Sequence, residues 1–95
     1  MAKGYVIAHA EVTDPAKWGQ YAAKASEAIK KYGGKPLARG GKSEVAEGKG
    51  VARNVVLEFD SYEAARTYAF SPEYAEAKAL REGAGTIDIV VVEGV

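Results

Sequence analysis

The sequence predicts an α+β fold in which two strand-helix-strand units share one antiparallel sheet. Three observations support this prediction. Runs of apolar and β-branched residues alternate with segments of helical spacing, this order occurs twice, and a glycine-rich connection over residues 40–50 separates the two halves. A chain of 95 residues suffices for one domain, so we expect a single domain over residues 1–95.

The first half begins with a strand and a helix. Residues 5–12 are largely apolar and contain neither glycine nor proline, as is typical of a strand. Residues 13–15, Thr-Asp-Pro, supply a capping oxygen and a proline for the first helical turn. Apolar side chains then recur at helical spacing from Trp18 to Tyr32, and Gly33-Gly34 predicts the helix end.

Three further strands are expected. The first covers residues 36–39 and breaks at a pair of glycines, with an extension through residues 43–46 as an option. Valine-rich residues 53–59 form the next strand, and residues 87–93 form the last.

Two short helices complete the second half. Asp60 or Ser61 caps a helix over residues 62–69. Ser71 and Pro72 provide a new cap and a proline at the first turn, so a separate helix is expected to begin here and to end before the glycines of residues 83–85.

Two such units in one sheet give the ferredoxin-like split βαβ arrangement, a sheet with helices on one face. Alternation places Val55, Leu57 and Phe59 under the helices. The opposite face is then half apolar and half polar, so we expect it to pack against a second copy in a homodimer. Its predicted residues are Tyr5, Ile7, His9, Glu11, Asn54, Val56 and Glu58.

Composition argues against several partners. Thirteen basic and thirteen acidic residues cancel without long runs of either sign, so we expect no nucleic acid and no membrane as partner. The absence of cysteine fits a cytoplasmic protein, and the N-terminal residues lack the apolar length of a signal peptide. The glycine pairs lack the spacing and the lysine of a nucleotide-binding loop.

Seven segments together resemble the family catalogued as domain of unknown function 1330, over essentially the whole chain. They are Gly4-Tyr5 through Ala8-His9, Thr13-Asp14-Pro15, Tyr32-Gly33-Gly34, Arg39-Gly40-Gly41, Glu58-Phe59 before Ser61-Tyr62-Glu63-Ala64-Ala65, Ser71-Pro72-Glu73-Tyr74 and Val92-Glu93-Gly94. The resemblance implies the dimeric α/β-barrel superfamily, whose members are ferredoxin-like and pair through their sheets. It implies no settled activity, although relatives in that superfamily include cofactor-independent monooxygenases, lactone isomerases and haem-handling enzymes.

His9 is the only histidine, and histidine is the side-chain type that exchanges a proton near neutral pH. It is therefore the first candidate for acid-base catalysis. The alternative is a strand histidine that is hydrogen-bonded across the dimer interface. One histidine without cysteine does not form a usual zinc site, so no metal is expected.

Arg39 and Glu58 each have a structural and a functional interpretation. Arg39 precedes two glycines, where the backbone can turn and present the guanidinium to a carboxylate ligand. Glu58 lies within a valine-rich strand, where an ionised carboxylate needs a partner. We expect an ion pair of Glu58 with Arg39 or His9 first, and a role of Glu58 as general base second.

Three further residues are candidates for ligand binding. Asn54 shares the open face with His9. Tyr68, like Tyr74, could donate a hydroxyl hydrogen bond, although helical tyrosines more often pack through the ring. Ser71 is explained by helix capping, or else it forms the polar lip of a pocket.

Two functional hypotheses follow, besides a third interpretation, haem or metal handling, which requires His9 to face an open cavity. In the first, the chain binds or converts a small organic acid without an organic cofactor, with His9 transferring protons, Arg39 anchoring the anion and Glu58 orienting the site. In the second, it is a non-catalytic dimeric module that binds a metabolite or a partner protein, and the same polar residues form interface pairs.

Overall fold

The structure is a computed structural model that describes residues 2–95. In these residues the elements follow the order β1 (Gly4–Val12), α1 (Pro15–Lys31), β2 (Lys35–Arg39), β3 (Arg53–Phe59), α2 (Tyr62–Ala69), α3 (Pro72–Leu80) and β4 (Gly85–Glu93). The sheet has the order β2-β3-β1-β4, and every neighbouring pair is antiparallel. This arrangement confirms the predicted ferredoxin-like α+β fold.

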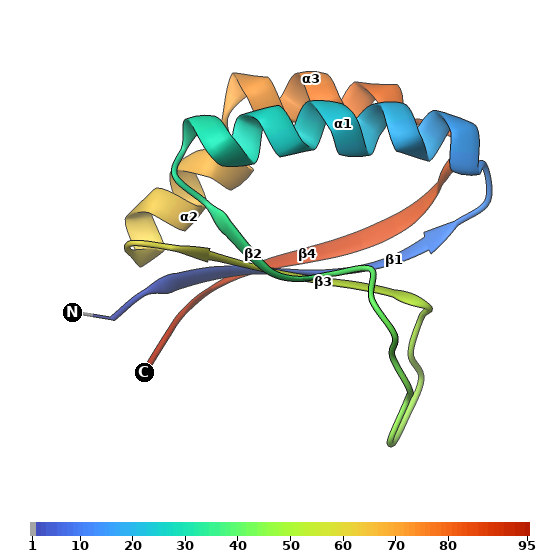
Figure 1. Cartoon of the computed structure of the whole chain (residues 1–95), viewed down its shortest axis with the longest axis horizontal. Coiled ribbons are helices and arrows are strands. Elements are labelled where there is room, and N and C mark those ends of the chain that lie inside the picture. The colour runs from blue at the N-terminus through green and yellow to red at the C-terminus, as the bar shows by residue number, and fades with distance from the viewer. Residues whose placement is uncertain (1) are drawn as a thin grey trace.

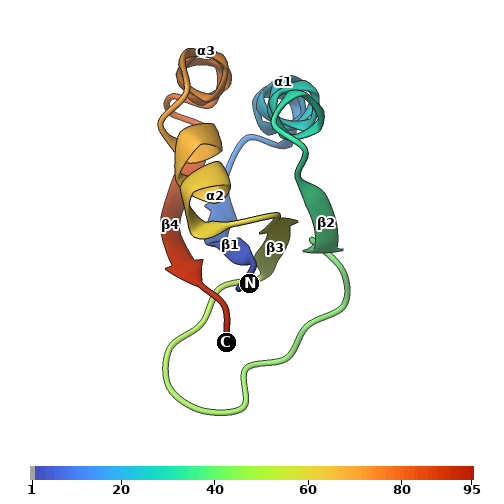
Figure 2. The same cartoon turned by 90° about the vertical axis from the view of Figure 1, so that its left-hand side faces the viewer.

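The helices all lie on one face of the sheet (Figure 1). Figure 2 shows α1 above β2 and α3 above β4, so the helical layer spans both edges of the sheet. We call the face beneath the helices the covered face and the other the open face. Strand register confirms the predicted assignment, because Val6 pairs with Leu57 on the covered face while His9 pairs with Asn54 on the open face.

Each helix begins at a side-chain cap, as predicted. Asp14, Ser61 and Ser71 accept hydrogen bonds from the backbone amides three residues later, at 3.2, 3.1 and 3.0 Å. The Ser71 hydroxyl also donates to the carbonyl of Tyr68 at 2.7 Å. The interruption between α2 and α3 is therefore a helix restart in which one serine closes the first helix and opens the second.

The predicted strand extension over residues 43–46 is wrong. Residues 40–52 contain neither helix nor strand, and we call this segment the arm. It projects from the side of the sheet opposite the helices (Figure 1). Gly40, at φ +67°, starts the departure, a conformation that glycine adopts without strain. Every side chain of residues 41–50 is exposed, so no packing holds this segment in strand register.

The hydrophobic core lies between the covered face and the helices. Phe59 is 1% exposed and stacks on Tyr68 with ring centroids 5.2 Å apart. Ala65 in α2 and Ala77 in α3 are fully buried. These small side chains let α2 pack closely on the sheet and α3 pack closely on α1. A Cβ at Gly34 would lie 2.6 Å from the Phe59 ring, so the chain requires glycine here as it enters β2.

The longest helix of the described residues, α1, is amphipathic. None of the described helices is both long enough and apolar enough to cross a membrane.

Candidate functional site

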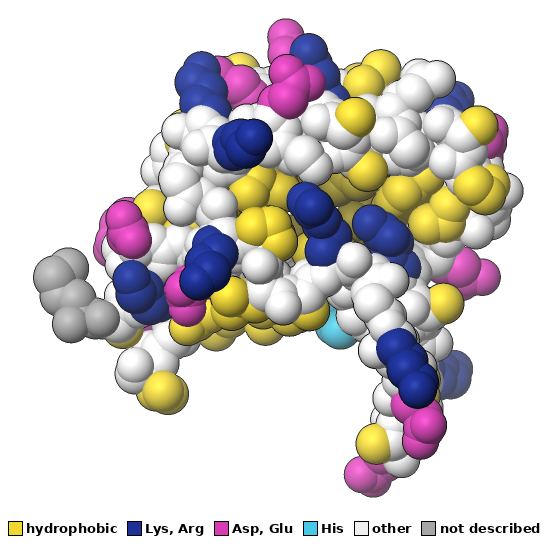
Figure 3. Space-filling view, in the orientation of Figure 1, with side chains coloured by type: hydrophobic (Ala, Val, Ile, Leu, Met, Phe, Trp, Pro, Cys, Tyr) yellow, Lys and Arg dark blue, Asp and Glu magenta, His cyan; other side chains and the backbone are white. Residues whose placement is uncertain are grey.

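A cavity of about 300 Å³ lies between the covered face and helices α1 and α3. Apolar side chains from β1, β3 and β4 line it, among them Val6, Leu57 and Ile89. Figure 3 shows a hollow below α1 that has hydrophobic side chains inside it and Lys or Arg side chains beside it. The cavity therefore combines an apolar interior with a positively charged entrance.

The charged residues that line the cavity are all cations: Arg39, Arg53, Lys78 and Arg81. Among residues 2–95, salt bridges join only Lys3 to Asp60 and Lys31 to Glu73. None of the four cavity cations is thus paired with a described carboxylate. Four unneutralised positive charges around one apolar space create a field that attracts anions.

Arg39 reaches the cavity because β2 contains a one-residue bulge. Lys35 pairs with Glu58, but Ala38 pairs with Val56, so Leu37 is an extra residue in the strand. The extra residue reverses the alternation and places Arg39 on the covered face. Its Nη1 donates to the hydroxyl of Ser26 in α1 at 3.3 Å.

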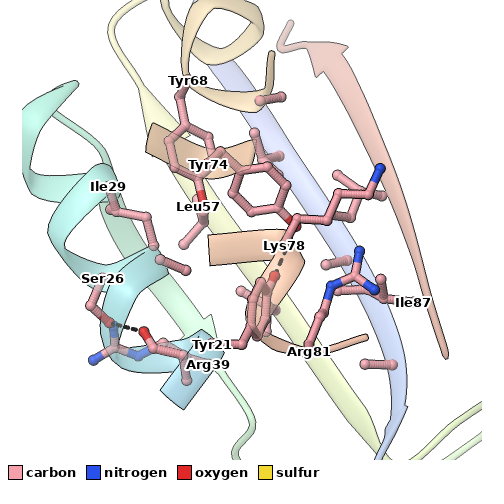
Figure 4. Close-up of a pocket in the computed structure, with 18 of the residues that line it drawn as sticks. Tyr21, Ser26, Ile29, Arg39, Leu57, Tyr68, Tyr74, Lys78, Arg81 and Ile87 are labelled. Atoms are coloured by element: carbon pink, nitrogen blue, oxygen red, sulfur yellow. Dashed lines mark hydrogen bonds between the residues drawn. The ribbon is translucent and has the colours of Figure 1, made fainter. Parts of the chain in front are cut away.

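Arg81 is held by aromatic rings. Its guanidinium lies 5.3 Å from the centre of the Tyr21 ring and 6.0 Å from that of Trp18, within the range of cation-π contacts. Its Nε is buried and has no hydrogen-bond partner among the described residues. Lys78 lies three residues earlier on α3, so the two cations share a face of that helix (Figure 4).

Tyrosine hydroxyls supply the neutral polar groups of the cavity. The hydroxyls of Tyr21 and Tyr74 are 2.8 Å apart and buried (Figure 4). Burial raises the pKa of Tyr21 well above its ordinary value, and the neighbouring Tyr74 raises it further. Burial likewise raises the pKa of Tyr68. These phenols stay protonated at physiological pH and can donate hydrogen bonds to an anion.

The open face carries a different set of polar groups. His9 lies 2.6 Å from Asn54, through Nδ1 and Oδ1. The Asn54 amide nitrogen donates to the carbonyl of Val51 at 3.3 Å, so Oδ1 is the atom that faces His9. In this network Nδ1 of His9 donates to Oδ1 of Asn54.

Glu58 accepts a hydrogen bond from the hydroxyl of Tyr5 at 3.0 Å, on the same open face. This bond raises the pKa of Tyr5 above its ordinary value. The expected ion pair of Glu58 with Arg39 or His9 is wrong. Arg39 lies on the other face of the sheet because of the bulge, and His9 bonds to Asn54 instead.

A hollow of about 650 Å³ on the open face lies between the sheet and the arm. His9, Asn54 and Asp88 form its floor, and residues of the arm form its wall. Among residues 2–95, no group of three or more His, Cys, Asp or Glu side chains gathers in a way that could hold a metal ion.

The predicted site residues thus divide between two faces. Arg39 and Tyr68 line the cavity, whereas His9, Asn54 and Glu58 lie on the open face. The Ser71 hydroxyl is used on both sides by the helix restart and lines neither hollow. A single pocket that combines His9, Arg39 and Glu58 does not form within one chain.

Sequence reasoning missed Arg53, Lys78, Arg81 and Tyr21. Arg53 has the same parity as Val55, and that alternation already indicates the covered face. Lys78 and Arg81 follow Tyr74 by four and seven residues, which places all three on one side of a helix. Helical spacing was therefore the signal that could have found the second group of cations.

A family model described as "Domain of unknown function (DUF1330)" matches residues 3–95, so the chain belongs to this family. No curated protein matches the sequence.

Solved structures share the fold at low sequence identity. A protein of unknown function from Rhodopseudomonas palustris has a TM-score of 0.77 and 14% identity, over 99% of this chain and 83% of that one. The cofactor-independent oxygenase SnoaB from Streptomyces nogalater has a TM-score of 0.60 and 9% identity, over 97% and 92%. A dimeric ferredoxin-like protein of unknown function from Thermobifida fusca has a TM-score of 0.53 and 17% identity, over 99% and 92%. At these identities the likeness concerns the fold alone.

Proposed function

We propose that this member of the DUF1330 family is a homodimer that binds a small, largely apolar organic anion in the cavity between sheet and helices. The observation that carries the proposal is the charge of the lining. The charged residues around the cavity are all cations, and no described carboxylate pairs with them. An anionic ligand would supply the missing counter-charge.

The shape and polarity of the cavity support an apolar body for this ligand. Its volume of about 300 Å³ is at the lower end of ligand pockets, so a small molecule would fill it. Valine, isoleucine, leucine and alanine side chains form its floor, and burying hydrocarbon against them contributes about 25 cal/mol per Å². One of the Tyr21 and Tyr74 hydroxyls uses its proton in their mutual hydrogen bond, and the other can donate to a polar group of the ligand.

The lining favours binding over proton transfer. No histidine or carboxylate is among the described residues that line the cavity, and arginine, lysine and tyrosine keep their protons at neutral pH. A general base poised near neutral pH is what proton-transfer catalysis requires. We therefore assign the cavity a binding role and the polar residues of the open face to the dimer interface.

The open face supports dimerisation through its mixture of apolar and internally paired polar groups. Val90 and Val92 are 55% and 40% exposed in the single chain, and Ile7 and Val56 lie in the same rows. Tyr5 donates a hydrogen bond to Glu58 and His9 bonds to Asn54, so a second sheet that covers this face meets these four side chains already hydrogen-bonded. The dimeric protein from Thermobifida fusca has the same fold.

The binding role is tested by calorimetric titration with octanoate and with octan-1-ol, which share a hydrocarbon chain and differ in charge. We expect octanoate to bind at least about tenfold more tightly, as charge-assisted hydrogen bonds require. Emission of Trp18, the only tryptophan and part of the lining, should change during the octanoate titration.

The matched variants are Arg39→Gln/Lys78→Gln, which removes two cavity cations, and Lys24→Gln, which removes an exposed cation of α1 that does not line the cavity. The first should reduce the preference for octanoate, since two of the four cavity cations remain, and the second should retain it in full. Equal affinity of the wild-type protein for both probes, or no binding of either, would refute the proposal.

A second candidate is oxygenation of the bound compound, which is favoured by the fold shared with the Streptomyces nogalater oxygenase. An oxygen electrode with 1,4-dihydroxy-2-naphthoate, an oxidisable apolar acid, provides the test. Oxygen uptake that exceeds the uptake with the Arg39→Gln/Lys78→Gln variant would favour this candidate, and equal uptake would remove it.

A further inference from the structure

The four cavity cations form two groups on opposite sides of the cavity. Arg39 belongs to the edge strand β2, and Arg53 begins the neighbouring strand β3. Lys78 belongs to α3 and Arg81 is its C-cap, and this helix lies above the opposite edge strand β4 (Figure 2). Figure 4 shows Tyr21 between Arg39 on one side and Lys78 with Arg81 on the other.

The sheet side of the space between the two groups is apolar, and the Tyr21 and Tyr74 hydroxyls are polar groups on its helical side. The lining residues that the central strand β1 contributes are Val6, Ala8 and Ala10, and β4 contributes Ile87, Ile89 and Val91. A ligand that reaches from one cationic group to the other would therefore cross a hydrocarbon surface. Its middle part should be largely apolar, since a polar group that faces the sheet there would lose its hydration without gaining partners.

Each cationic group has its own means of holding an anion. On the β2 side, Arg39 is oriented by its hydrogen bond to Ser26. On the α3 side, Arg81 is oriented by its contacts with Trp18 and Tyr21, and its buried Nε lacks a described hydrogen-bond partner. A buried donor without a partner is uncommon in folded proteins, and an anion at this end would satisfy it.

We infer that the ligand is a dianion, with two acidic groups at the ends of an apolar spacer. One acidic group binds at Arg39 and Arg53, and the other binds at Lys78 and Arg81. This inference rests on the proposed function and narrows its substrate class from an organic acid to an apolar diacid. A single carboxylate would neutralise only one of the two groups and leave the other without a counter-charge.

The test compares octanedioate with octanoate, which have equal chain length and differ only in the second carboxylate. Calorimetric titration should give one octanedioate per chain, bound about tenfold or more tightly than octanoate. A series of diacids from butanedioate to dodecanedioate should show a maximum of affinity at one length, because only a matching spacer reaches both groups.

Single charge-neutralising variants test the two ends separately. Arg39→Gln and Lys78→Gln should each weaken octanedioate binding about tenfold, and each should weaken octanoate only about twofold, since one intact end still accepts a single carboxylate. Lys78 is exposed, so its replacement is not expected to affect folding. Lys24→Gln, outside the cavity, should change neither affinity.

The outcomes separate this inference from the proposed function. If octanoate and octanedioate bind equally well and both prefer the wild type to the double variant, the diacid inference is refuted while anion binding stands. If one single variant abolishes the binding of both acids, the site has one anion anchor and the inference is likewise refuted. If neither acid binds, both proposals fall.

Discussion

The two faces of the sheet differ in whether their polar side chains have partners. On the open face, His9 bonds to Asn54 and Tyr5 bonds to Glu58, so these four side chains are paired across neighbouring strands. On the covered face, the cavity cations have no carboxylate partner among the described residues. Paired groups suit a surface that a second protein covers, and unpaired cations suit a site that receives an anion.

The contrast also separates the two functional hypotheses that the sequence left open. The candidate acid-base residues His9 and Glu58 are found on one side of the sheet, and the residues that could anchor an anion are found on the other. We therefore regard them as belonging to two tasks, assembly and binding, and the following experiments are chosen to test that division.

The largest expected effect concerns the core under the covered face. Phe59→Ala should lower the free energy of unfolding by about 3 to 5 kcal/mol, because it leaves a cavity beside the Tyr68 ring. Val90→Ala, on the open face, should lower it by at most about 1 kcal/mol. Urea unfolding at one fixed protein concentration provides both values. Equal losses would contradict the assignment of the core to the covered face.

The next effect concerns the dimer. Val90→Asp should weaken association by about 3 kcal/mol, roughly a hundredfold, because it buries an unpaired carboxylate between two sheets. Sedimentation velocity over a dilution series should show the wild type at twice the chain mass of 10.0 kDa and the variant at the chain mass. Ala23→Asp, on the exposed side of α1, should remain dimeric. A monomeric wild type would refute the interface.

A smaller effect is expected for the tyrosine hydrogen bonds, of which Tyr21–Tyr74 lies beside the covered face and Tyr5–Glu58 lies on the open face. Tyr21→Phe should lower stability by about 1 to 2 kcal/mol, because the buried hydroxyl of Tyr74 loses its partner. Tyr5→Phe should cost less than about 0.5 kcal/mol in the monomer, since Glu58 can then be hydrated. Thermal unfolding of a monomeric background such as Val90→Asp allows the comparison. A larger loss of stability for Tyr5→Phe than for Tyr21→Phe would contradict the assignment of the Tyr21 hydroxyl to the buried core and of the Tyr5 hydroxyl to the open face.

The smallest effect lies outside both faces, where α1 meets α3. Hydrogen bonds from Lys31 and Tyr32 hold the pKa of Glu73 at about 2, below its ordinary 4.5. The unfolded chain therefore binds this proton more readily than the folded chain. The stabilisation is complete above pH 4.5 and is lost as the pH falls toward 2. Glu73→Gln should lower the melting temperature slightly at neutral pH, and the difference from wild type should vanish in strong acid. A difference that is independent of pH would contradict this assignment.

Most of the fold was predictable because local signals agreed with one another. The caps at Asp14, Ser61 and Ser71 and the alternation along β1 and β3 each depend on a few neighbouring residues. The arm was predicted less well, because β-branched Val45 suggested a strand where the chain has no partner to pair with. Pairing is a tertiary property that a short segment does not encode.

The site was predictable only in part. Arg39 and Tyr68 were recognised as ligand candidates, yet the face on which Arg39 lies depends on the bulge at Leu37. The neighbouring Pro36 is compatible with a bulge and equally with a regular edge strand, so the sequence does not decide between them. Arg81 was missed because its partners, Trp18 and Tyr21, lie some sixty residues away in the chain. The meeting of α1 and α3 creates that end of the cavity.

The bulge in β2 also has a consequence for how this chain can change over evolutionary time. Deleting Leu37 would remove the bulge without replacing any other residue. Arg39 would then lie on the open face, which we assign to the dimer interface, instead of the covered face that lines the cavity. The loss of one residue would therefore move Arg39 from the proposed binding site to the proposed dimer interface. Family members that differ by one residue in this strand are expected to differ in ligand preference or in pairing, even where the arginine itself is retained.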